Sequence, residues 1–334
     1  MSTMQKLPMG TTGLTVSALG LGCVSMSDAY GHADEAESFA ALQTALEQGV
    51  DFFDTADLYG KGGNESLIGR FMRRAARERV FIATKFGSLP AGPDGRPGVD
   101  NSPAHIRAAC EASLQRLGVD VIDLYYMHRR DPKVPIAESV GAMADLVAAG
   151  KVRALGLSEV APATLREAHA VHPIAALQSE YSLWYREPED QILGVCRELG
   201  VTFVPFSPIG RGFLAGGVTT EQFEPGDLRR NLPRFRGTAL EKNQALVAQL
   251  VEFARQRNAT AAQIALAWLL SKNDGKTVVV PIPGTKRPKY VLENAAAAAL
   301  RLSADDVTWL ESVFGRGSVA GDRYPEIEEA RAGT

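Results

Sequence analysis

Several features are scarce in this sequence, and each shortage excludes a class of protein. The chain has only three cysteines, Cys23, Cys110 and Cys196, with no CxxC spacing and no paired histidine nearby. We therefore expect neither a disulfide framework nor a structural metal site. No apolar run approaches the roughly 18 residues of a membrane-spanning helix, and residues 1–10 hold no apolar segment of signal-peptide length. The expectation is a cytoplasmic protein with no membrane partner.

An excess of charge of either sign is missing as well. The formal net charge is −3, and 22% of the residues are charged against 45% that are hydrophobic. This composition is typical of a soluble globular protein with ample material for a core, and it does not favour a nucleic acid as partner. The 334 residues could form one large domain or two, because barrels of alternating strands and helices often exceed the usual domain size.

Short apolar runs alternate with amphipathic stretches along most of the chain. The predicted strands lie at residues 16–22, 51–54, 80–85, 121–127, 151–157, 175–179, 201–205 and 277–281. Helix signals stand between them, such as Asp34 with Glu37 and Ser102 followed by Pro103. Eight strands that alternate with helices predict the α/β class and a (β/α)8 TIM barrel, here as a single domain of residues 1–334. We also expect an N-terminal hairpin at 6–16 and extra helices at 240–257, before the eighth strand, and at 303–314, at the C-terminus.

The connections between these elements are unequal in length. Those that leave the predicted strands are long, at residues 22–33, 86–102, 180–188 and 206–239, whereas those that enter strands are short. Long loops belong to the C-terminal rim of a barrel, where barrel enzymes build their sites. A doubly wound sheet is the alternative fold, but the glycines Gly20 and Gly22 lack the third glycine of the dinucleotide-binding turn.

Four titratable side chains stand at or just beyond the ends of predicted strands: Asp54, Tyr59, Lys85 and His128. A tyrosine can act as a general acid near neutral pH if a neighbouring cation lowers its pKa, and Lys85 could be that cation. Asp54 would be the counter-ion of the lysine, and His128 would orient a substrate oxygen. Taken singly, each has a simpler explanation: a packing tyrosine, a surface lysine or a loop histidine. Together they predict an acid–base site.

The motifs around these residues resemble those of a known family. DxxDTAxxYG (residues 51–60), ATK (83–85), YYMH (125–128) and IPGTKR (282–287) are similar to the aldo-keto reductases over nearly the whole chain. The resemblance implies that Asp54, Tyr59, Lys85 and His128 are the catalytic tetrad. It also implies reduction of an aldehyde or ketone to an alcohol by hydride transfer from NADPH, with Tyr59 as general acid and no metal.

The resemblance also assigns cofactor-binding residues. It places Ser158 and Gln178 at the nicotinamide carboxamide and Phe206 against the nicotinamide ring. Lys286 and Arg287 would bind the 2′-phosphate and so favour NADPH over NADH. The remaining residues assigned to cofactor binding are Gly22, Cys23, Ser207, Pro208, Ile209, Gly210, Arg211, Gly284, Thr285, Glu293 and Asn294, of which 207–211 would follow the pyrophosphate. Cys23 has a simpler interpretation as a buried structural cysteine.

The sequence departs from the family pattern at two positions. Tyr290 stands where many members have an arginine, so phosphate binding would depend on Lys286 and Arg287. Glu159 stands where many have asparagine. The segments 157–159 and 179–184 resemble a branch that includes pyridoxal reductases and plant alkaloid reductases.

A substrate pocket can be predicted from residues in loops that follow strands, namely Tyr30, Phe86, Arg129 and Trp184. Aromatic walls suit a planar carbonyl compound, although aromatic residues in loops also serve to anchor them. Two other functions stay open: a Schiff-base aldolase using Lys85, and a cofactor-sensing regulatory subunit of the same family. The expected partner is a small carbonyl compound, and we favour a monomer.

Overall fold

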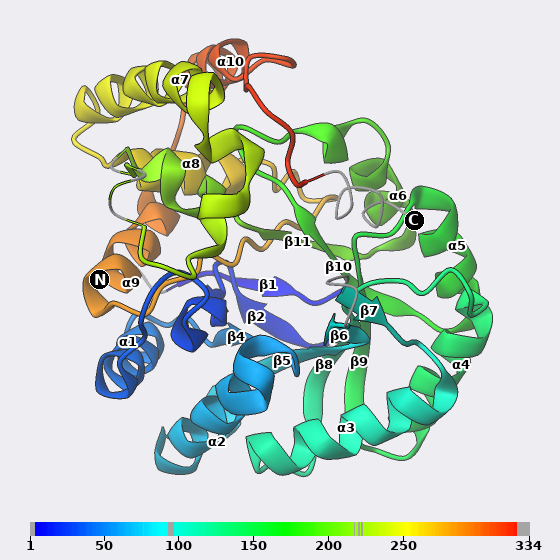
Figure 1. Cartoon of the computed structure of the whole chain (residues 1–334). Helices are drawn as coiled ribbons and strands as arrows, with labels where there is room; N and C mark the ends of the chain where they lie inside the picture. The colour runs from blue at the N-terminus through cyan, green and yellow to red at the C-terminus, as the bar shows by residue number, and fades with distance from the viewer. Residues whose placement is uncertain are drawn as a thin grey trace.

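The structure, a computed structural model, describes residues 4–75, 77–92, 97–216, 218–219, 221 and 223–325. Its centre is a parallel sheet of seven strands in the order β11-β10-β9-β8-β5-β4-β3 (Figure 1). The strands are β3 (Leu21–Gly22), β4 (Phe52–Asp54), β5 (Phe81–Phe86), β8 (Ile122–Met127), β9 (Val152–Ser158), β10 (Ile174–Glu180) and β11 (Thr202–Phe206). Each strand is next to the one that follows it in this parallel series, as expected when a helix crosses over between them.

An extended segment, residues 278–284, closes this sheet into a barrel. The Phe203 N–H of β11 donates to the Val278 carbonyl at 2.8 Å, and on the other side the Gly22 N–H of β3 donates to the Pro283 carbonyl at 3.2 Å. Pro281 and Pro283 have no N–H to donate, so the segment forms isolated bridges instead of a continuous ladder. The predicted (β/α)8 barrel is confirmed, with its eighth strand in this interrupted form.

The predicted first strand at 16–22 divides into two pieces. Val16 belongs to the N-terminal hairpin of β1 (Lys6–Pro8) and β2 (Thr15–Ser17), and only Leu21–Gly22 pairs with β4 in the barrel. The apolar run is continuous in sequence, but the chain passes from one sheet to the other within it. The hairpin packs on one end of the barrel, where the Gly10 N–H donates to Thr202 Oγ1 at 2.8 Å.

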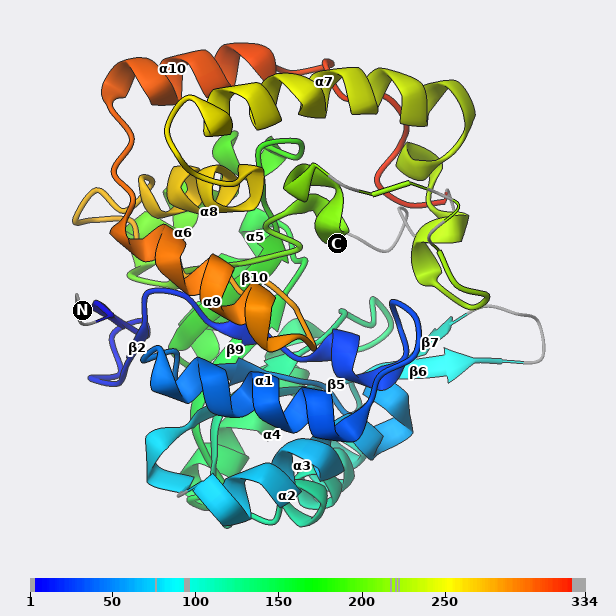
Figure 2. The same ribbon diagram turned by 90° about the vertical axis from the view of Figure 1, so that its left-hand side faces the viewer.

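Helices surround the sheet (Figures 1 and 2). They are α1 (Glu35–Glu47), α2 (Gly63–Ala75), α3 (Pro103–Leu117), α4 (Ile136–Ala148), α5 (Pro162–Val171), α6 (Ile192–Leu199), α7 (Gly237–Arg255), α8 (Ala261–Leu270), α9 (Pro288–Ala296) and α10 (Ala304–Val313). The side chains of Asp34 and Ser102 cap α1 and α3 as predicted, and that of Thr260 caps α8. The predicted extra helices are α7 and α10, which lie side by side in Figure 2. A small hairpin, β6 (Ser88–Ala91) with β7 (Pro97–Val99), occupies the expected loop 86–102.

A single large ring fills part of the barrel interior. Tyr126 of β8 is fully buried and lies opposite Gly156 of β9. A Cβ atom added to Gly156 would lie 2.3 Å from Cδ1 of that ring, so only glycine fits there. The absence of a side chain on one strand is therefore what admits the phenol ring from its neighbour.

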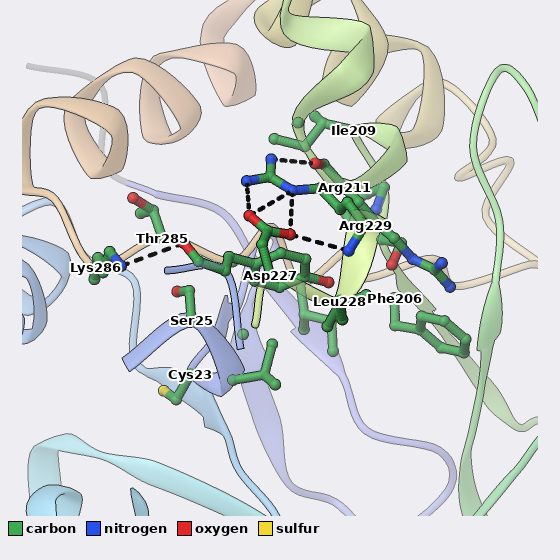
Figure 3. Close-up of a pocket in the computed structure, with 18 of the residues that line it drawn as sticks. Cys23, Ser25, Phe206, Ile209, Arg211, Asp227, Leu228, Arg229, Thr285 and Lys286 are labelled. Atoms are coloured by element: carbon green, nitrogen blue, oxygen red, sulfur yellow. Dashed lines mark hydrogen bonds and ion pairs between the residues drawn. The ribbon is translucent and has the colours of Figure 1, made fainter. Parts of the chain in front are cut away.

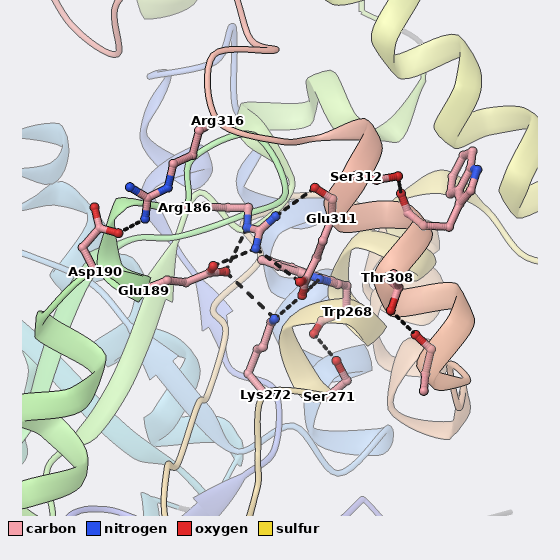
Figure 4. Close-up of polar contacts among 12 residues, drawn as sticks. Arg186, Glu189, Asp190, Trp268, Ser271, Lys272, Thr308, Glu311, Ser312 and Arg316 are labelled. Carbon is pink, nitrogen blue, oxygen red and sulfur yellow. Dashed lines mark hydrogen bonds and ion pairs between the residues drawn. The ribbon is translucent and has the colours of Figure 1, made fainter.

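The C-terminal helix is joined to the barrel by a partly buried polar network (Figure 4). Glu311 of α10 accepts from Trp268 Nε1 of α8 at 3.2 Å and forms an ion pair with Lys272. Arg186, in the loop after β10, lies 3.3 Å from Glu311 and 2.7 Å from Glu189. This network holds the loop after β10 against α8 and α10. Among the residues described, no helix combines the length and hydrophobicity needed to span a bilayer.

Candidate active site

A buried ion pair forms the base of the site. Lys85 of β5 is fully buried and forms an ion pair with Asp54 at the end of β4. Its Nζ also donates to the Thr55 carbonyl at 2.8 Å, and the second oxygen of Asp54 accepts from Gln178 Nε2 at 2.7 Å. Burial alone would lower the pKa of Lys85, but Asp54 and Tyr59 outweigh it and raise the pKa. Lys85 therefore stays an ammonium, which disfavours the Schiff-base alternative because that reaction needs a neutral amine.

The loop after β4 brings Tyr59 to this ammonium. Gly60, Lys61 and Gly62 have φ values of 56°, 53° and 86°, a left-handed run that turns the chain sharply into α2. The buried Asn64 then ties the loop down, since its side chain accepts from Thr55 Oγ1 at 2.6 Å and donates to the Cys23 carbonyl at 2.9 Å. As a result the hydroxyl of Tyr59 lies 3.5 Å from Lys85 Nζ.

His128 completes the group at the end of β8. Its ring lies edge-on to that of Tyr59, with the two centroids 5.9 Å apart. Burial, helped by Arg129 and Lys85, holds the pKa of His128 well below its usual range, so the imidazole is neutral. Its Nδ1 is buried and has no hydrogen-bond partner. The four residues of the proposed tetrad thus meet at one place, with a neutral ring and a phenol facing each other.

The electrostatics of Tyr59 differ from the sequence-based expectation. Lys85 does favour the phenolate, but burial of the phenol is the larger effect, and the pKa of Tyr59 is raised. The predicted influence of Lys85, which lowers this pKa, is therefore present, but burial outweighs it and the pKa of Tyr59 lies above its ordinary value. The hydroxyl is therefore protonated at neutral pH, which is the form that a proton donor needs.

A cavity of about 1230 Å³ opens above these residues at the C-terminal ends of the strands. Three of the tetrad side chains, Asp54, Tyr59 and His128, line it, whereas Lys85 lies behind them. Of the other residues predicted from the sequence, those that line it are Gly22, Cys23, Tyr30, Arg129, Ser158, Gln178, Phe206, Ser207, Pro208, Ile209, Arg211, Gly284, Thr285, Lys286, Arg287, Glu293 and Asn294. Segments far apart in the sequence therefore build one continuous wall.

Besides Lys85, three predicted residues do not line this cavity. Phe86 is fully buried in the core, where its ring stacks on Tyr125 with the centroids 4.8 Å apart. Trp184 stacks on Phe213 at 5.0 Å, and Gly210 backs onto the indole. The predicted pocket roles of Phe86 and Trp184 are thus not supported. Both rings pack against other aromatic residues and anchor loops, which was the alternative interpretation of these residues.

Residues within 206–215 and 223–232 form one side of the cavity (Figure 3). The buried Asp227 accepts from the Arg229 backbone N–H at 2.9 Å and forms an ion pair with its guanidinium at 2.6 Å. Arg229 in turn lies over the Tyr30 ring, 5.2 Å from its centroid. No pattern in the sequence indicates this contact, because it joins loops that follow β3 and β11.

The two basic residues expected at a 2′-phosphate are placed differently. Lys286 donates to the Gly31 carbonyl at 2.8 Å and to those of Tyr30 and His32. Arg287, the residue that precedes α9, is half-exposed, with Glu37 at 3.9 Å. Both line the cavity beside the N-terminus of α9, where the backbone N–H groups and the helix dipole favour negative charge.

These groups fit a nicotinamide dinucleotide. The cavity is lined by cations beside α9, by the phenol of Tyr59 and the imidazole of His128, and by Arg211 and Gly212, which belong to a loop with left-handed residues at 210–212. Such loops expose backbone N–H groups toward anions. No group of three or more side chains able to hold a metal ion occurs in the described part of the chain.

Some residues of the site could not be found from the sequence. Besides Asp227 and Arg229, the cavity is lined by Tyr324 near the C-terminus, whose ring lies 4.8 Å from the Arg211 guanidinium. Arg211 forms an ion pair with the buried Glu180 at 3.5 Å. Glu159, the departure from the family pattern, pairs with Arg323. These partners come together only in the folded chain, so no local sequence motif predicts their contacts.

Comparison with known proteins agrees with this architecture. Residues 18–314 match the model of the Aldo/keto reductase family. The chain is 43% identical over 323 residues to probable aldo-keto reductase 1 of Glycine max. The aligned region covers 96% of this chain and 92% of that protein. The protein therefore belongs to the aldo/keto reductase family.

Two solved structures share the fold over almost their whole length. A glycerol dehydrogenase from Gluconobacter oxydans has a TM-score of 0.84 at 26% identity, with 98% of this chain and 99% of that chain covered. An aldo/keto reductase from Klebsiella pneumoniae, solved in complex with NADP and acetate, has a TM-score of 0.73 at 26% identity, with 97% and 99% covered. The family and its oxidoreductase relatives support carbonyl chemistry at this site.

Proposed function

We propose that this protein reduces an aldehyde or ketone to an alcohol with NADPH, and that Tyr59 donates the proton. The observation that carries the proposal is the meeting of a protonated phenol, a neutral imidazole and a buried ammonium in one cavity, with Tyr59 Oη 3.5 Å from Lys85 Nζ. A nicotinamide nucleotide, when bound, would supply the hydride.

Each side chain has a separate task in this reaction. Tyr59 transfers its proton to the carbonyl oxygen, which becomes the alcohol oxygen. Lys85 favours the phenolate that remains, since a neighbouring cation stabilises that anion. Asp54 holds the ammonium in place, and Gln178 fixes Asp54 through its second oxygen. The neutral His128 can donate a hydrogen bond to the same substrate oxygen and orient it.

The choice of NADPH over NADH rests on the charges near α9. A 2′-phosphate carries about two negative charges and needs charge-assisted partners, which Lys286 and Arg287 can provide. Tyr290, where many relatives have an arginine, lines the same cavity. The assignment to a branch near pyridoxal and plant alkaloid reductases is part of this proposal and rests on segments 157–159 and 179–184.

Cofactor oxidation by the purified protein tests the proposal. NADPH and NADH are offered in parallel with a panel of aldehydes and ketones, and Tyr59→Phe is the control. We expect NADPH to be consumed with at least one carbonyl compound and the variant to lose about 10²- to 10⁴-fold in kcat, the contribution typical of a general acid. Cofactor binding by the variant, followed by protein fluorescence, should be retained. If NADPH binds without turnover, a cofactor-sensing role replaces the proposed reaction, and if it does not bind, the proposal fails.

A further inference from the structure

Among the residues described, one cation close to the tetrad, Arg129, has no counter-ion. Arg129 follows His128 directly at the end of β8 and lines the cavity. Its Nη1 donates to the His128 carbonyl at 2.7 Å and to Ser158 Oγ at 3.1 Å, both neutral acceptors. Within the described part of the chain it forms no ion pair with a carboxylate.

The other cations near the tetrad are neutralised. Lys85 pairs with Asp54, Arg211 lies 3.5 Å from Glu180, and Arg229 lies 2.6 Å from Asp227. A half-buried guanidinium without a counter-ion is costly to keep, because burial removes much of its hydration. An arginine left unpaired beside the reacting groups therefore indicates an anion that arrives from outside.

The form of the guanidinium narrows the chemistry of that anion. Its N–H groups make a planar fork that matches a carboxylate with two parallel hydrogen bonds, and among the described residues only one of its terminal nitrogens, Nη1, has a partner. Tyr30 and Tyr324 line the same cavity near Arg211, and burial raises the pKa of Tyr30 to about 12. These neutral phenol rings supply an apolar wall beside a cation.

We propose that the carbonyl substrate bears a carboxylate and that Arg129 binds it, with Tyr30 and Tyr324 against the body of the substrate. This proposal rests on the reductase function proposed above. In this pose the substrate is held at two points. Its carbonyl group lies between the Tyr59 phenol and the His128 imidazole, and its carboxylate binds the neighbouring Arg129. Arg129 would then determine which aldehydes are reduced.

A matched pair of substrates tests the proposal. The probes are 4-carboxybenzaldehyde and methyl 4-formylbenzoate, which share the aromatic aldehyde and differ in the negative charge. The ester is the more electron-withdrawing substituent, so intrinsic reactivity favours the uncharged compound. We expect the native protein nevertheless to have the higher kcat/KM for 4-carboxybenzaldehyde. In Arg129→Met the ratio of the two kcat/KM values should fall roughly 10- to 100-fold, the loss typical of one charged hydrogen bond.

Two control variants separate this role from others. Arg129→Lys keeps the charge without the fork and should retain part of the preference. Arg130→Met alters the next residue, whose guanidinium reaches Thr164 Oγ1 outside the cavity, and should leave the ratio unchanged. The ratio is the readout because Arg129 also lies near Tyr59, and an effect on the general acid would change both substrates alike. An unchanged ratio in Arg129→Met would overturn the proposal.

Turnover and binding distinguish the remaining outcomes. A carboxylate seated between Tyr59 and His128 would block the reaction, so inhibition by 4-carboxybenzaldehyde without its reduction would contradict the proposed pose. If neither aldehyde is reduced, the reductase function is at fault, and calorimetric titration of both compounds into the protein with NADP⁺ then decides. Tighter binding of the carboxylate, lost in Arg129→Met, supports recognition by Arg129, and equal binding refutes it.

Discussion

The two walls of the cavity are built on different principles. The strand wall consists of Asp54 and Gln178, with Lys85 behind them, and these residues come from β4, β5 and β10 and bind one another inside the barrel. In the loop wall, formed by residues within 22–33, 206–215, 223–232 and 285–287, one loop is held to another: the Leu228 N–H donates to the Ala29 carbonyl at 3.2 Å, and the His32 N–H donates to Glu224 at 2.9 Å. The hydrogen-bonded sheet fixes the position of the chemistry, while the loops carry recognition.

The largest effect should follow from breaking the strand wall. Lys85→Met leaves the Asp54 carboxylate buried without its cation, and we expect a loss of about 3–5 kcal/mol in the free energy of unfolding. Urea denaturation measures it. Adding Asp54→Asn to the same variant removes the stranded charge and should recover part of the stability, but no activity.

A loop-wall pair provides the contrast. Arg287 and Glu37 are 3.9 Å apart and both are about half-exposed. Arg287→Met should change the free energy of unfolding by less than about 1 kcal/mol. Equal losses in the two single variants would show that the walls do not differ in this way.

A second prediction concerns recognition by the loop wall. In Lys286→Met the ammonium that can meet a 2′-phosphate is gone, so KM for NADPH should rise about 10- to 100-fold, the effect of one charged hydrogen bond. KM for NADH should change little. Lys289→Met, on the exposed side of α9, is the matched control. A parallel rise for both cofactors would instead mean that Lys286 acts by holding the carbonyls of residues 30–32.

A further effect is a dependence of stability on pH. The folded-state pKa of His128 is lowered well below its ordinary value, so below about pH 6.5 the unfolded chain binds a proton that the folded chain does not. Stability contributed by the neutral ring is therefore present above that pH and is lost as the pH falls, by up to about 1.4 kcal/mol per pH unit. Urea denaturation between pH 7 and pH 5 should show a shallower loss for His128→Gln. The same slope in both proteins would count against a neutral buried imidazole.

The strand wall, together with His128 at the end of β8, is also the part of the site that can be predicted from the sequence. Asp54, Lys85 and His128 each follow an apolar run, and side chains at the ends of parallel strands necessarily meet at one rim. The same reasoning misplaced Phe86 and Trp184, because a residue that ends or follows a strand can face either the cavity or the packing behind it. Periodicity also merged two strands into one at residues 16–22, where nothing in the run marks the passage from hairpin to barrel.

The loop wall was predictable only in outline. The resemblance pointed to Lys286, yet its binding to the carbonyls of residues 30–32 depends on a loop 254 to 256 positions away in sequence. Asp227 and Tyr324 lie in segments with no periodic pattern, and their contacts form only when the barrel has closed. Long-range contacts between irregular segments produce no local sequence pattern from which they could be predicted.

Tyr126 and Gly156 also restrict how this protein can change over evolutionary time. The ring occupies the space that the missing side chain leaves, so a larger residue at position 156 cannot be accepted while the tyrosine remains. A smaller residue at position 126 would in turn leave a hollow inside the barrel, on the strand next to the one that carries Lys85. A change of side-chain volume at either position therefore requires a compensating change at the other, so the two residues are expected to change together.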